Sequence, residues 1–240
     1  MKQLLSAPAS NQSFGLQAMT EEILATFQIE SIHSSRNSSR HILNGYAPRN
    51  EEESRIYGMK RGLDFIADRQ NTITEENLHQ LYQISTGDYL PDEDRLLPDH
   101  FYRHDVVYVV DGKESREGLP AQQLPDAMKR LVDFANAKDG INELHKAAIL
   151  HFAFAYYHPY FDGNGRTARL LHLWYLVQQG YPAALFTPFS RYIAESKAAY
   201  YKAYDRVEKN ALISGYTDVT PFLSYFCNEV YNRLQVDAAP

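Results

Sequence analysis

The 240-residue sequence is short of several features that mark particular classes of protein. It has one cysteine, Cys227, so no disulfide can form within the chain, and a reducing compartment is indicated. Its formal net charge of −6 argues against broad binding to nucleic-acid backbones, which depends on clustered Lys and Arg. No apolar run is long enough to span a bilayer, and residues 1–10 lack the apolar stretch of a signal peptide. We therefore expect a soluble, cytoplasmic protein that binds neither nucleic acid nor a membrane.

The sequence does contain a series of helical segments. Hydrophobic residues make up 44 % and charged residues 22 % of it, which are ordinary values for a chain with a buried core. Apolar residues recur at helical spacing, and capping residues such as Asn50 and Thr74 come before acidic first turns. The pattern predicts helices that begin near residues 20, 50, 74, 125, 142, 165, 190 and 220. The first is expected to reach 34, and those from 190 and 220 to reach 209 and 236. The Ser- and Arg-rich stretch 31–40 is predicted to be a mobile connection.

One segment departs from the helical pattern. Residues 101–110 are rich in Val and Tyr, and Asp111-Gly112-Lys113 follows them as a turn. We interpret this segment as a short β-hairpin or extended flap whose first strand includes Val106, Val107, Tyr108, Val109 and Val110. The predicted fold class is therefore all-α, a helical bundle with a small β-hairpin flap. Its organisation is an N-terminal region over 1–70, followed by the main domain with C-terminal helices over 71–240.

The most informative run extends from His158 to Arg169. Pro159 ends the preceding helix, so His158 is expected at a helix terminus that faces a loop. The sequence Asp-Gly-Asn-Gly at 162–165 favours a sharp turn whose backbone N–H groups point into one concavity at the start of the next helix. Such a turn is a ready anion site. Arg166 and Arg169 are three residues apart on that helix, so both guanidinium groups project near its start.

The side chains of this run supply the parts that phosphoryl or nucleotidyl transfer needs. Arginine binds phosphate oxygens with two hydrogen bonds at once. Asp162 offers a carboxylate for Mg²⁺, which usually binds through one or two carboxylates and the phosphates of the substrate. His158 can take a proton from a hydroxyl near neutral pH. The alternative is a plain turn between two helices with solvated arginines, but the histidine before it and the two arginines after it favour the active-site interpretation.

The run resembles the signature of the Fic-domain family, His-Pro-Phe-x-Asp-Gly-Asn-Gly-Arg-x-x-Arg. It differs at one specified position, where Tyr160 replaces Phe as an apolar anchor under the loop. The resemblance extends in organisation over about 80–226. It implies that the chain moves AMP from ATP to a hydroxyl of a target protein, with self-modification as a further outcome.

The resemblance also implies a role for each residue of the run. His158 would take the proton of the attacking hydroxyl and Asp162 would hold Mg²⁺. The phosphate site would consist of the backbone at Gly163, Asn164 and Gly165 together with the side chains of Arg166 and Arg169. Relatives of the Doc type, which act as kinases, have Lys at the position of Gly165, so glycine here favours AMP transfer.

Two further elements follow from the resemblance. The flap over 106–110 would pair with the backbone of the target as an added strand. Tyr200 and Tyr201 resemble a tyrosine pair beside the nucleotide base and would stack on adenine, but packing of both rings in the core explains them equally well.

An acidic residue near the N-terminus is predicted to control the site. Glu30 continues the apolar face of Ile23 and Phe27 at helical spacing, and a carboxylate on the packed side of a helix needs a partner. Fic proteins with an inhibitory helix carry Ser/Thr-x-x-x-Glu-Gly/Asn, which the run from Thr26 to Ser31 resembles except for Ser31. By this resemblance Glu30 pairs with Arg169 and inhibits the enzyme, and some relatives use this glutamate to remove AMP. The alternative is that the helix ends there and leaves Glu30 in water.

Two other functions remain to be weighed. A Fic transferase could use another donor and move UMP, phosphate or phosphocholine instead of AMP. A non-enzymatic nucleotide-sensing module is the second alternative, but its sequence would be expected to lose His158 or Asp162. Relatives with an inhibitory helix often form dimers, so a homodimer is also an expectation.

Overall fold

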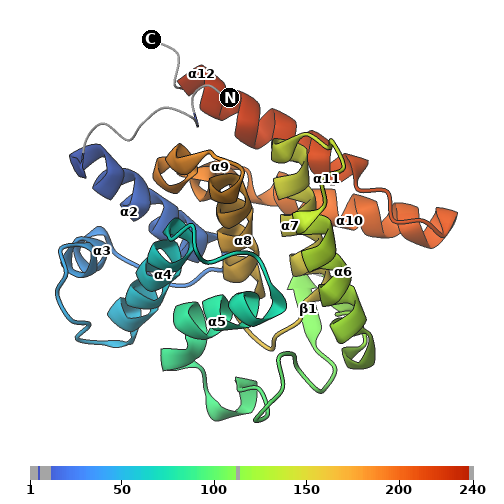
Figure 1. Cartoon of the computed structure of the whole chain (residues 1–240), viewed down its shortest axis with the longest axis horizontal. Coiled ribbons are helices and arrows are strands. Elements are labelled where there is room, and N and C mark those ends of the chain that lie inside the picture. Colours follow the sequence, from blue (N-terminus) through green and yellow to red (C-terminus); the bar gives the residue numbers. More distant parts are fainter. Residues whose placement is uncertain (1–4, 6–11, 112–113, 238–240) are drawn as a thin grey trace.

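The computed structural model describes residue 5, residues 12–111 and residues 114–237, and the ribbon is almost entirely helical (Figure 1). The helices are α2 (Gln12–Ile29), α3 (Arg36–Leu43), α4 (Glu51–Ala67), α5 (Glu75–Thr86), α6 (Leu124–Asn136), α7 (Glu143–Tyr157), α8 (Asn164–Gln178), α9 (Phe189–Glu195), α10 (Lys197–Ser214), α11 (Thr220–Tyr225) and α12 (Asn232–Asp237). A π-helical segment, Phe226–Tyr231, joins the last two. Two strands pair in one small sheet. The predicted fold class is confirmed.

Helix α8 forms the centre of the molecule. It lies between α2 and α4 on one side and α7 on the other (Figure 1), and every residue from Arg166 to Val177 is buried. A helix that is covered on all sides has no solvated face, so its polar side chains need partners inside the protein. Ile23 and Phe27 of α2 belong to the same hydrophobic core as Leu170 of α8, so the N-terminal helix packs directly onto the domain.

Several predicted helix starts are confirmed by capping hydrogen bonds. The side chain of Asn50 accepts a bond from the N–H of Glu53 at 2.9 Å, and Thr74 accepts one from Asn77 at 3.1 Å. Asn142 accepts one from Leu144 at 3.0 Å. Each bond satisfies an amide that has no partner within the helix, which fixes where α4, α5 and α7 begin.

The N-terminal part differs from the prediction in two ways. Helix α2 starts well before residue 20 and ends at Ile29, and the hydroxyl of Thr20 bonds the carbonyl of Leu16 inside the helix instead of capping it. The mobile connection predicted over 31–40 is wrong in its second half, because residues 36–40 belong to α3. Ser35 caps α3 through the N–H of Ser38, and Ile42 buries its side chain in the core.

Two C-terminal predictions also need correction. The single helix expected over 190–209 is two helices, α9 and α10, because the backbone at Ser196 (φ −116°, ψ 28°) leaves the helical region. The hydroxyl of Ser196 donates to the carbonyl of Tyr192 at 2.6 Å, which satisfies the end of α9. The last helix continues to Asp237, but the π-helical segment interrupts it.

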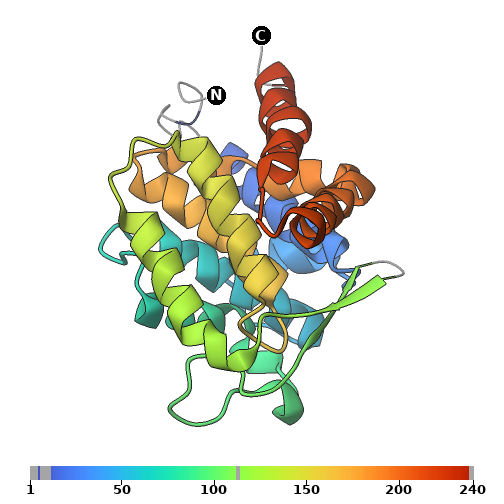
Figure 2. The same ribbon diagram turned by 90° about the vertical axis from the view of Figure 1, so that its right-hand side faces the viewer.

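The flap is an antiparallel hairpin that stands away from the helices (Figure 2). Strand β1 (Tyr108–Asp111) pairs with β2 (Glu114–Glu117), with Tyr108 opposite Glu117. Gly112 and Lys113 of the predicted turn lie outside the described residues. Of the helices within the described ranges, none combines the length and apolar character that would be needed to cross a membrane.

Candidate active site

The loop between α7 and α8 is closed by a side chain of α8 itself. Asn164 accepts a hydrogen bond from the N–H of Tyr160 at 2.9 Å and donates one to its carbonyl at 2.8 Å. The ring of Tyr160 is fully buried and stacks on Tyr82 of α5, with ring centroids 3.6 Å apart. Tyr160 thus anchors the loop from below, the role expected for the aromatic residue at this position.

The loop turns sharply at Gly163 into the start of α8. Gly163 has φ 79°, and a Cβ on it would lie 2.5 Å from Cγ2 of Thr86, so only glycine fits here. Helix α8 begins directly afterwards, so the amides of Asn164 and Gly165 stand in its first turn, where no carbonyl of the same helix faces them. Such N–H groups and the positive end of a helix dipole together favour an anion.

His158 ends α7 in a left-handed conformation. Its φ is 54°, and its N–H donates to the carbonyl of Phe154 at 3.1 Å. Nδ1 lies 3.3 Å from the carbonyl of Ala155, which assigns the ring proton to Nδ1 and leaves Nε2 as a proton acceptor. Burial lowers the pKa of His158 to about 4, and the charges of Arg116 and Arg103 act in the same direction. The imidazole is therefore neutral at pH 7.

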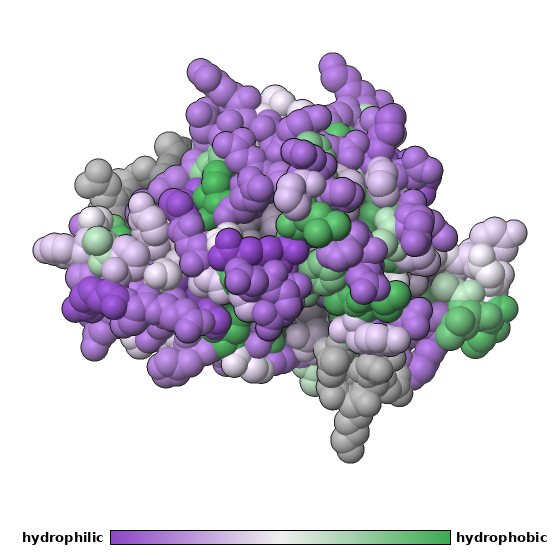
Figure 3. Space-filling model, turned by 90° about the horizontal axis from the view of Figure 1, so that it is seen from below, coloured by the Kyte–Doolittle hydropathy of each residue, from purple (hydrophilic) through white to green (hydrophobic). Residues whose placement is uncertain are grey.

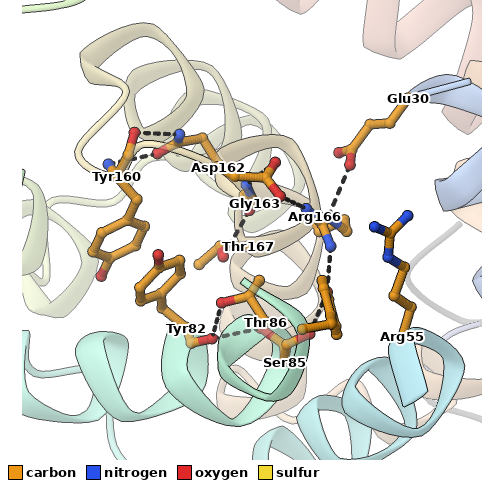
Figure 4. A network of polar contacts seen from close by, with 12 residues as sticks. Glu30, Arg55, Tyr82, Ser85, Thr86, Tyr160, Asp162, Gly163, Arg166 and Thr167 are labelled. Carbon is orange, nitrogen blue, oxygen red and sulfur yellow. Dashed lines mark hydrogen bonds and ion pairs between the residues drawn. The ribbon is translucent and has the colours of Figure 1, made fainter. Parts of the chain in front are cut away.

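Glu30 forms ion pairs with both arginines of the motif, and Figure 4 shows its contact with Arg166. Its Oε2 is 2.8 Å from Nε of Arg166, and its Oε1 pairs with Nη2 of Arg169, so the predicted Glu30–Arg169 pair is present. The pair with Arg166 was not predicted. Arg169 also donates to the side chain of Thr26 and to its carbonyl. A Cβ on Gly165 would lie 2.5 Å from Oε1 of Glu30, so glycine at this position leaves room for the carboxylate.

A helix-terminating turn sets the position of Glu30. The N–H of Ile32 donates to the carbonyl of Phe27 at 2.9 Å, and the N–H of Ser31 donates to Gln28 at 3.2 Å. These two bonds form a Schellman motif, in which the residue after the helix cap is left-handed and is usually Gly or Asn. Ser31 takes this conformation with φ 59°. Helix α2 therefore does end at this point, but Glu30 is only 20 % exposed and turns toward the arginines instead of the solvent.

Asp162 and Arg166 form the other charged contact of the loop. Oδ2 of Asp162 lies 2.7 Å from Nη2 of Arg166, and Oδ1 accepts the N–H of Gly163 at 2.6 Å. Burial acts to raise the pKa of Asp162, but the charge of Arg166 and these hydrogen bonds outweigh it and lower the pKa below its usual value. Burial likewise acts to lower the pKa of Arg166, whereas the charge of Glu30 and the neighbours Tyr89 and Asp162 raise it above the ordinary range. Both side chains are therefore charged at pH 7.

Three residues beside the motif, Tyr89, Arg55 and Thr26, were not assigned to the active site from the sequence. Arg166 donates to the hydroxyl of Tyr89, and the guanidinium groups of Arg55 and Arg166 lie 5.2 and 5.5 Å from the centroid of that ring. Arg55 comes from α4 and faces the site from the side opposite the loop (Figure 4). Thr26 was noted only as part of the inhibitory pattern. The sequence carries no signal for Tyr89 or Arg55, because tertiary packing alone brings them to the motif.

The two residues predicted to contact adenine, Tyr200 and Tyr201, lie in different environments. Tyr200 is 3 % exposed, its hydroxyl lies 2.8 Å from Nε2 of His151, and its ring packs against Phe222, which agrees with the core alternative. Tyr201 is partly exposed, and its hydroxyl donates to the carbonyl of Ile29 at 3.4 Å. It therefore lies beside the end of α2, next to Glu30.

The flap presents part of its predicted surface to the solvent. Val106 and Tyr108 are 55 % and 62 % exposed, while Val107 and Val109 are half-buried. The face seen from below is mostly hydrophilic, with only small hydrophobic areas between polar ones (Figure 3). Exposed apolar side chains on a hairpin with a free edge are suited to pairing with an extended polypeptide.

Comparison with known proteins agrees with this geometry. Residues 72–176 match the model of the Fic/DOC family. The chain is 30 % identical over 102 residues to a protein adenylyltransferase, fic-1, of Caenorhabditis elegans, which is 42 % of this chain and 18 % of the worm protein. It is 30 % identical over 120 residues to a probable protein adenylyltransferase of Aquifex aeolicus, which is 48 % of this chain and 37 % of that protein. The chain thus spans well under half the length of both relatives.

A solved structure shares the fold. A Fic family protein from Desulfovibrio desulfuricans superposes with a TM-score of 0.75 over 96 % of this chain and 68 % of that chain, at 19 % identity. At this identity the likeness concerns the fold alone. The match to the Fic/DOC family model covers residues 72–176, and these residues include the run from His158 to Arg169.

Proposed function

We propose that this protein transfers AMP from ATP to a hydroxyl group of a protein. The observation that carries the proposal is the neutral His158 at the edge of an anion site made of the α8 amides, Arg166 and Arg169. The carboxylate of Glu30 pairs with both of these cations, which supports an anion site at this place. The relatives in worm and Aquifex are named protein adenylyltransferases, which supports the same reaction here.

The chemistry follows from the position of the imidazole. Nε2 of His158 accepts the proton of the target hydroxyl while its oxygen forms a bond to the α-phosphorus of ATP. The bond from that phosphorus to the bridging oxygen breaks, and pyrophosphate leaves with the electron pair. Arg166 and Arg169 hold the negative charge of the leaving group, and the amides of Asn164 and Gly165 bind the phosphate oxygens.

Asp162 fits a magnesium site that the substrate completes. Its carboxylate is ionised, 47 % exposed and adjacent to the anion site, and Mg²⁺ typically binds through such a carboxylate and phosphate oxygens. No group of three or more metal-binding side chains occurs among the residues that the structure describes, so a dedicated protein cage is not part of the proposal. The ion would neutralise phosphate charge, while Asp162 of this chain would orient it.

The second part of the proposal is that Glu30 inhibits the transfer. Its carboxylate forms ion pairs with Arg166 and Arg169, the two cations that the terminal phosphates of ATP would need. ATP that binds beside Glu30 would be displaced from the orientation that brings its α-phosphorus to the hydroxyl. Removal of AMP from a modified target remains part of this proposal, because the same glutamate lies beside the phosphate site.

Mass spectrometry of the Glu30→Gly protein tests the proposal. The variant is incubated with ATP, Mg²⁺ and a cell lysate, and peptides from the lysate and from the chain itself are searched for an added AMP. The same variant with His158→Ala is the matched control, and it should give no product. A mass gain that corresponds to UMP, phosphate or phosphocholine, with the respective donor, would assign a different transfer. Unmodified peptides with every donor would contradict an enzymatic role.

A further inference from the structure

Arg103 is a buried arginine whose partners are backbone carbonyls. Its side chain is 2 % exposed, and burial lowers its pKa although the guanidinium remains charged. Nε donates to the carbonyl of His158 at 2.8 Å, Nη1 to that of Asp105 at 2.6 Å, and Nη2 to that of Leu119. No described carboxylate forms an ion pair with it. The charge of Asp105 acts against the effect of burial on the pKa of Arg103, but a buried cation without an ion pair is costly, so the bonds to carbonyls need an explanation.

The three carbonyls belong to the two elements that must cooperate in the proposed reaction. Asp105 and Leu119 flank the hairpin on its two sides, while His158 carries the proposed base. The main chain adds to the link, because the N–H of Arg103 donates to the carbonyl of Pro159 at 2.9 Å. One guanidinium therefore ties both ends of the flap to the residue that ends α7.

The Arg103 guanidinium is closely packed against the base of the hairpin. A Cβ on Gly118 would lie 2.8 Å from Nη2 of Arg103 and 3.4 Å from Cβ of His158. The N–H of Gly118 donates to the carbonyl of Val107 at 2.9 Å, which closes the base of the hairpin just beyond the arginine. Glycine at 118 thus lets the hairpin base approach both side chains.

We propose that Arg103 is a positioning residue, which holds the His158 backbone at a fixed distance from the base of the flap. This inference rests on the proposed function, since His158 is the base only in that reaction. His158 is left-handed, a conformation that a non-glycine residue keeps only when its surroundings hold it. The bond from Arg103 to its carbonyl supplies that constraint. A hydroxyl on a polypeptide bound to the flap would then meet Nε2 in one orientation.

Kinetics of Arg103 variants test this link. In the Glu30→Gly background, Arg103→Gln should lower kcat for transfer of labelled AMP from ATP by about 10- to 100-fold, because small displacements of a catalytic group have effects of this size. KM for ATP should change less than about twofold, since Arg103 contacts no residue of the proposed phosphate site. Arg103→Lys keeps the charge but cannot reach three carbonyls at once, so kcat should also fall. Arg130→Gln removes an exposed arginine of α6 and should leave kcat unchanged.

A second readout does not depend on activity. In protein with labelled histidine, the NMR titration of His158, assigned with His158→Gln, should move to higher pH in Arg103→Gln, because one of the cations that face it is lost. Arg116 and Asp162 still face the ring in every variant, and Arg103→Lys should stay close to the parent. Amide exchange at Gly118 should accelerate in both Arg103 variants as the hairpin base loosens.

The two readouts separate this inference from the proposed function. Folded Arg103→Lys and Arg103→Gln proteins with the parent kcat and unchanged Gly118 exchange would overturn the positioning role. If the Gln variant does not fold, the Lys variant decides alone by the same criteria. If the Glu30→Gly parent transfers no AMP, the proposed function fails, while Gly118 exchange and the His158 titration still decide whether Arg103 links the two elements.

Discussion

Oε2 of Glu30 lies 2.8 Å from Nε of Arg166, at the start of the central helix. Arg166 is fully buried, so its charge requires an anion, and in this structure Glu30 and Asp162 provide it. A phosphate group is another anion that could pair with the Arg166 guanidinium, since arginine binds phosphate oxygens with two hydrogen bonds. Under the proposed function, Glu30 and ATP would compete for the same cation, and the energy of the ion pair would determine how strongly the glutamate inhibits.

Loss of the Glu30 charge should release AMP transfer. Charge-assisted hydrogen bonds contribute about 1.5–3 kcal/mol each, so Glu30→Gln and Glu30→Gly should both raise the rate of AMP transfer by at least about tenfold. Glu30→Gln is the more informative of the two variants, because it keeps the shape of the side chain and removes only the charge. Glu21→Gln, elsewhere on α2, is the control for charge loss and should behave like the wild type. The rates are measured with labelled ATP at fixed Mg²⁺, and equal rates for all four proteins would refute inhibition by Glu30.

The same substitution should change thermal stability in a way that ATP reverses. Without the Glu30 charge, Arg169 loses the carboxylate it pairs with and Arg166 keeps only Asp162, which should lower the free energy of unfolding by roughly 2–4 kcal/mol after allowance for the partial exposure of Glu30. For a chain of this size that is a fall in Tm of roughly 5–15 °C. ATP at a hundred times its Kd restores about 2.7 kcal/mol. Thermal unfolding of Glu30→Gln with and without ATP should therefore show a larger ATP shift than the wild type. Equal shifts would mean that ATP does not occupy the place of Glu30.

The chemical motif could be predicted from the sequence because its geometry is local. Pro159 ends one helix, Gly163 permits the turn, and Arg166 follows one turn later, so the chain order alone brings these groups together. The hairpin was predicted for the same reason, since its strands are neighbours in sequence. Contacts within a few residues depend on backbone propensity and side-chain spacing, which a single sequence displays.

The contacts that complete the site depend on tertiary packing and were found only in the structure. Tyr89 contacts Arg166 and Arg55 lies over the ring of Tyr89; both come from other elements, and no local pattern marks them. Arg103 binds carbonyls, and every residue offers a carbonyl, so sequence spacing cannot identify its partners. Helix α3 was missed because its serines suggested a loop, whereas burial of Ile42 in the core stabilises it as a helix.

Acid should destabilise the protein through His158. Burial lowers the pKa of this group from an unfolded value near 6.5 to about 4, so between these pH values the unfolded chain binds more protons than the folded one. Stability is therefore complete above about pH 6.5 and is lost as the pH falls toward 4. The contribution of His158 between pH 7 and pH 5 is at most about 2 kcal/mol. The buried side chains of His151 and His172 also have lowered pKa values and act in the same direction.

Urea unfolding at pH 7 and pH 5 measures this loss. His158→Gln should reduce the difference between the two free energies of unfolding, because the group that must stay neutral is gone. The exposed His100→Gln provides the control and should leave the difference as in the wild type. An unchanged pH dependence in His158→Gln would mean that His158 titrates in the folded protein near its usual pH.

Ser31→Gly should strengthen inhibition, because it removes backbone strain from the turn that positions Glu30. Ser31 has φ 59°, which costs an L-residue about 1–2 kcal/mol and costs glycine almost nothing, whereas glycine adds about 0.5–1 kcal/mol of unfolded-state entropy. The net gain of up to about 1 kcal/mol should raise Tm by roughly 2–4 °C and lower basal AMP transfer, since the Schellman motif holds Glu30 against Arg166 more firmly. Ser31→Ala is the matched control: like glycine it loses the hydroxyl that Lys197 contacts at 3.1 Å, but it keeps the strain. Thermal unfolding and labelled-ATP assays of both variants measure the two effects. A Gly variant no more stable and no less active than the Ala variant would show that backbone strain at Ser31 does not limit inhibition.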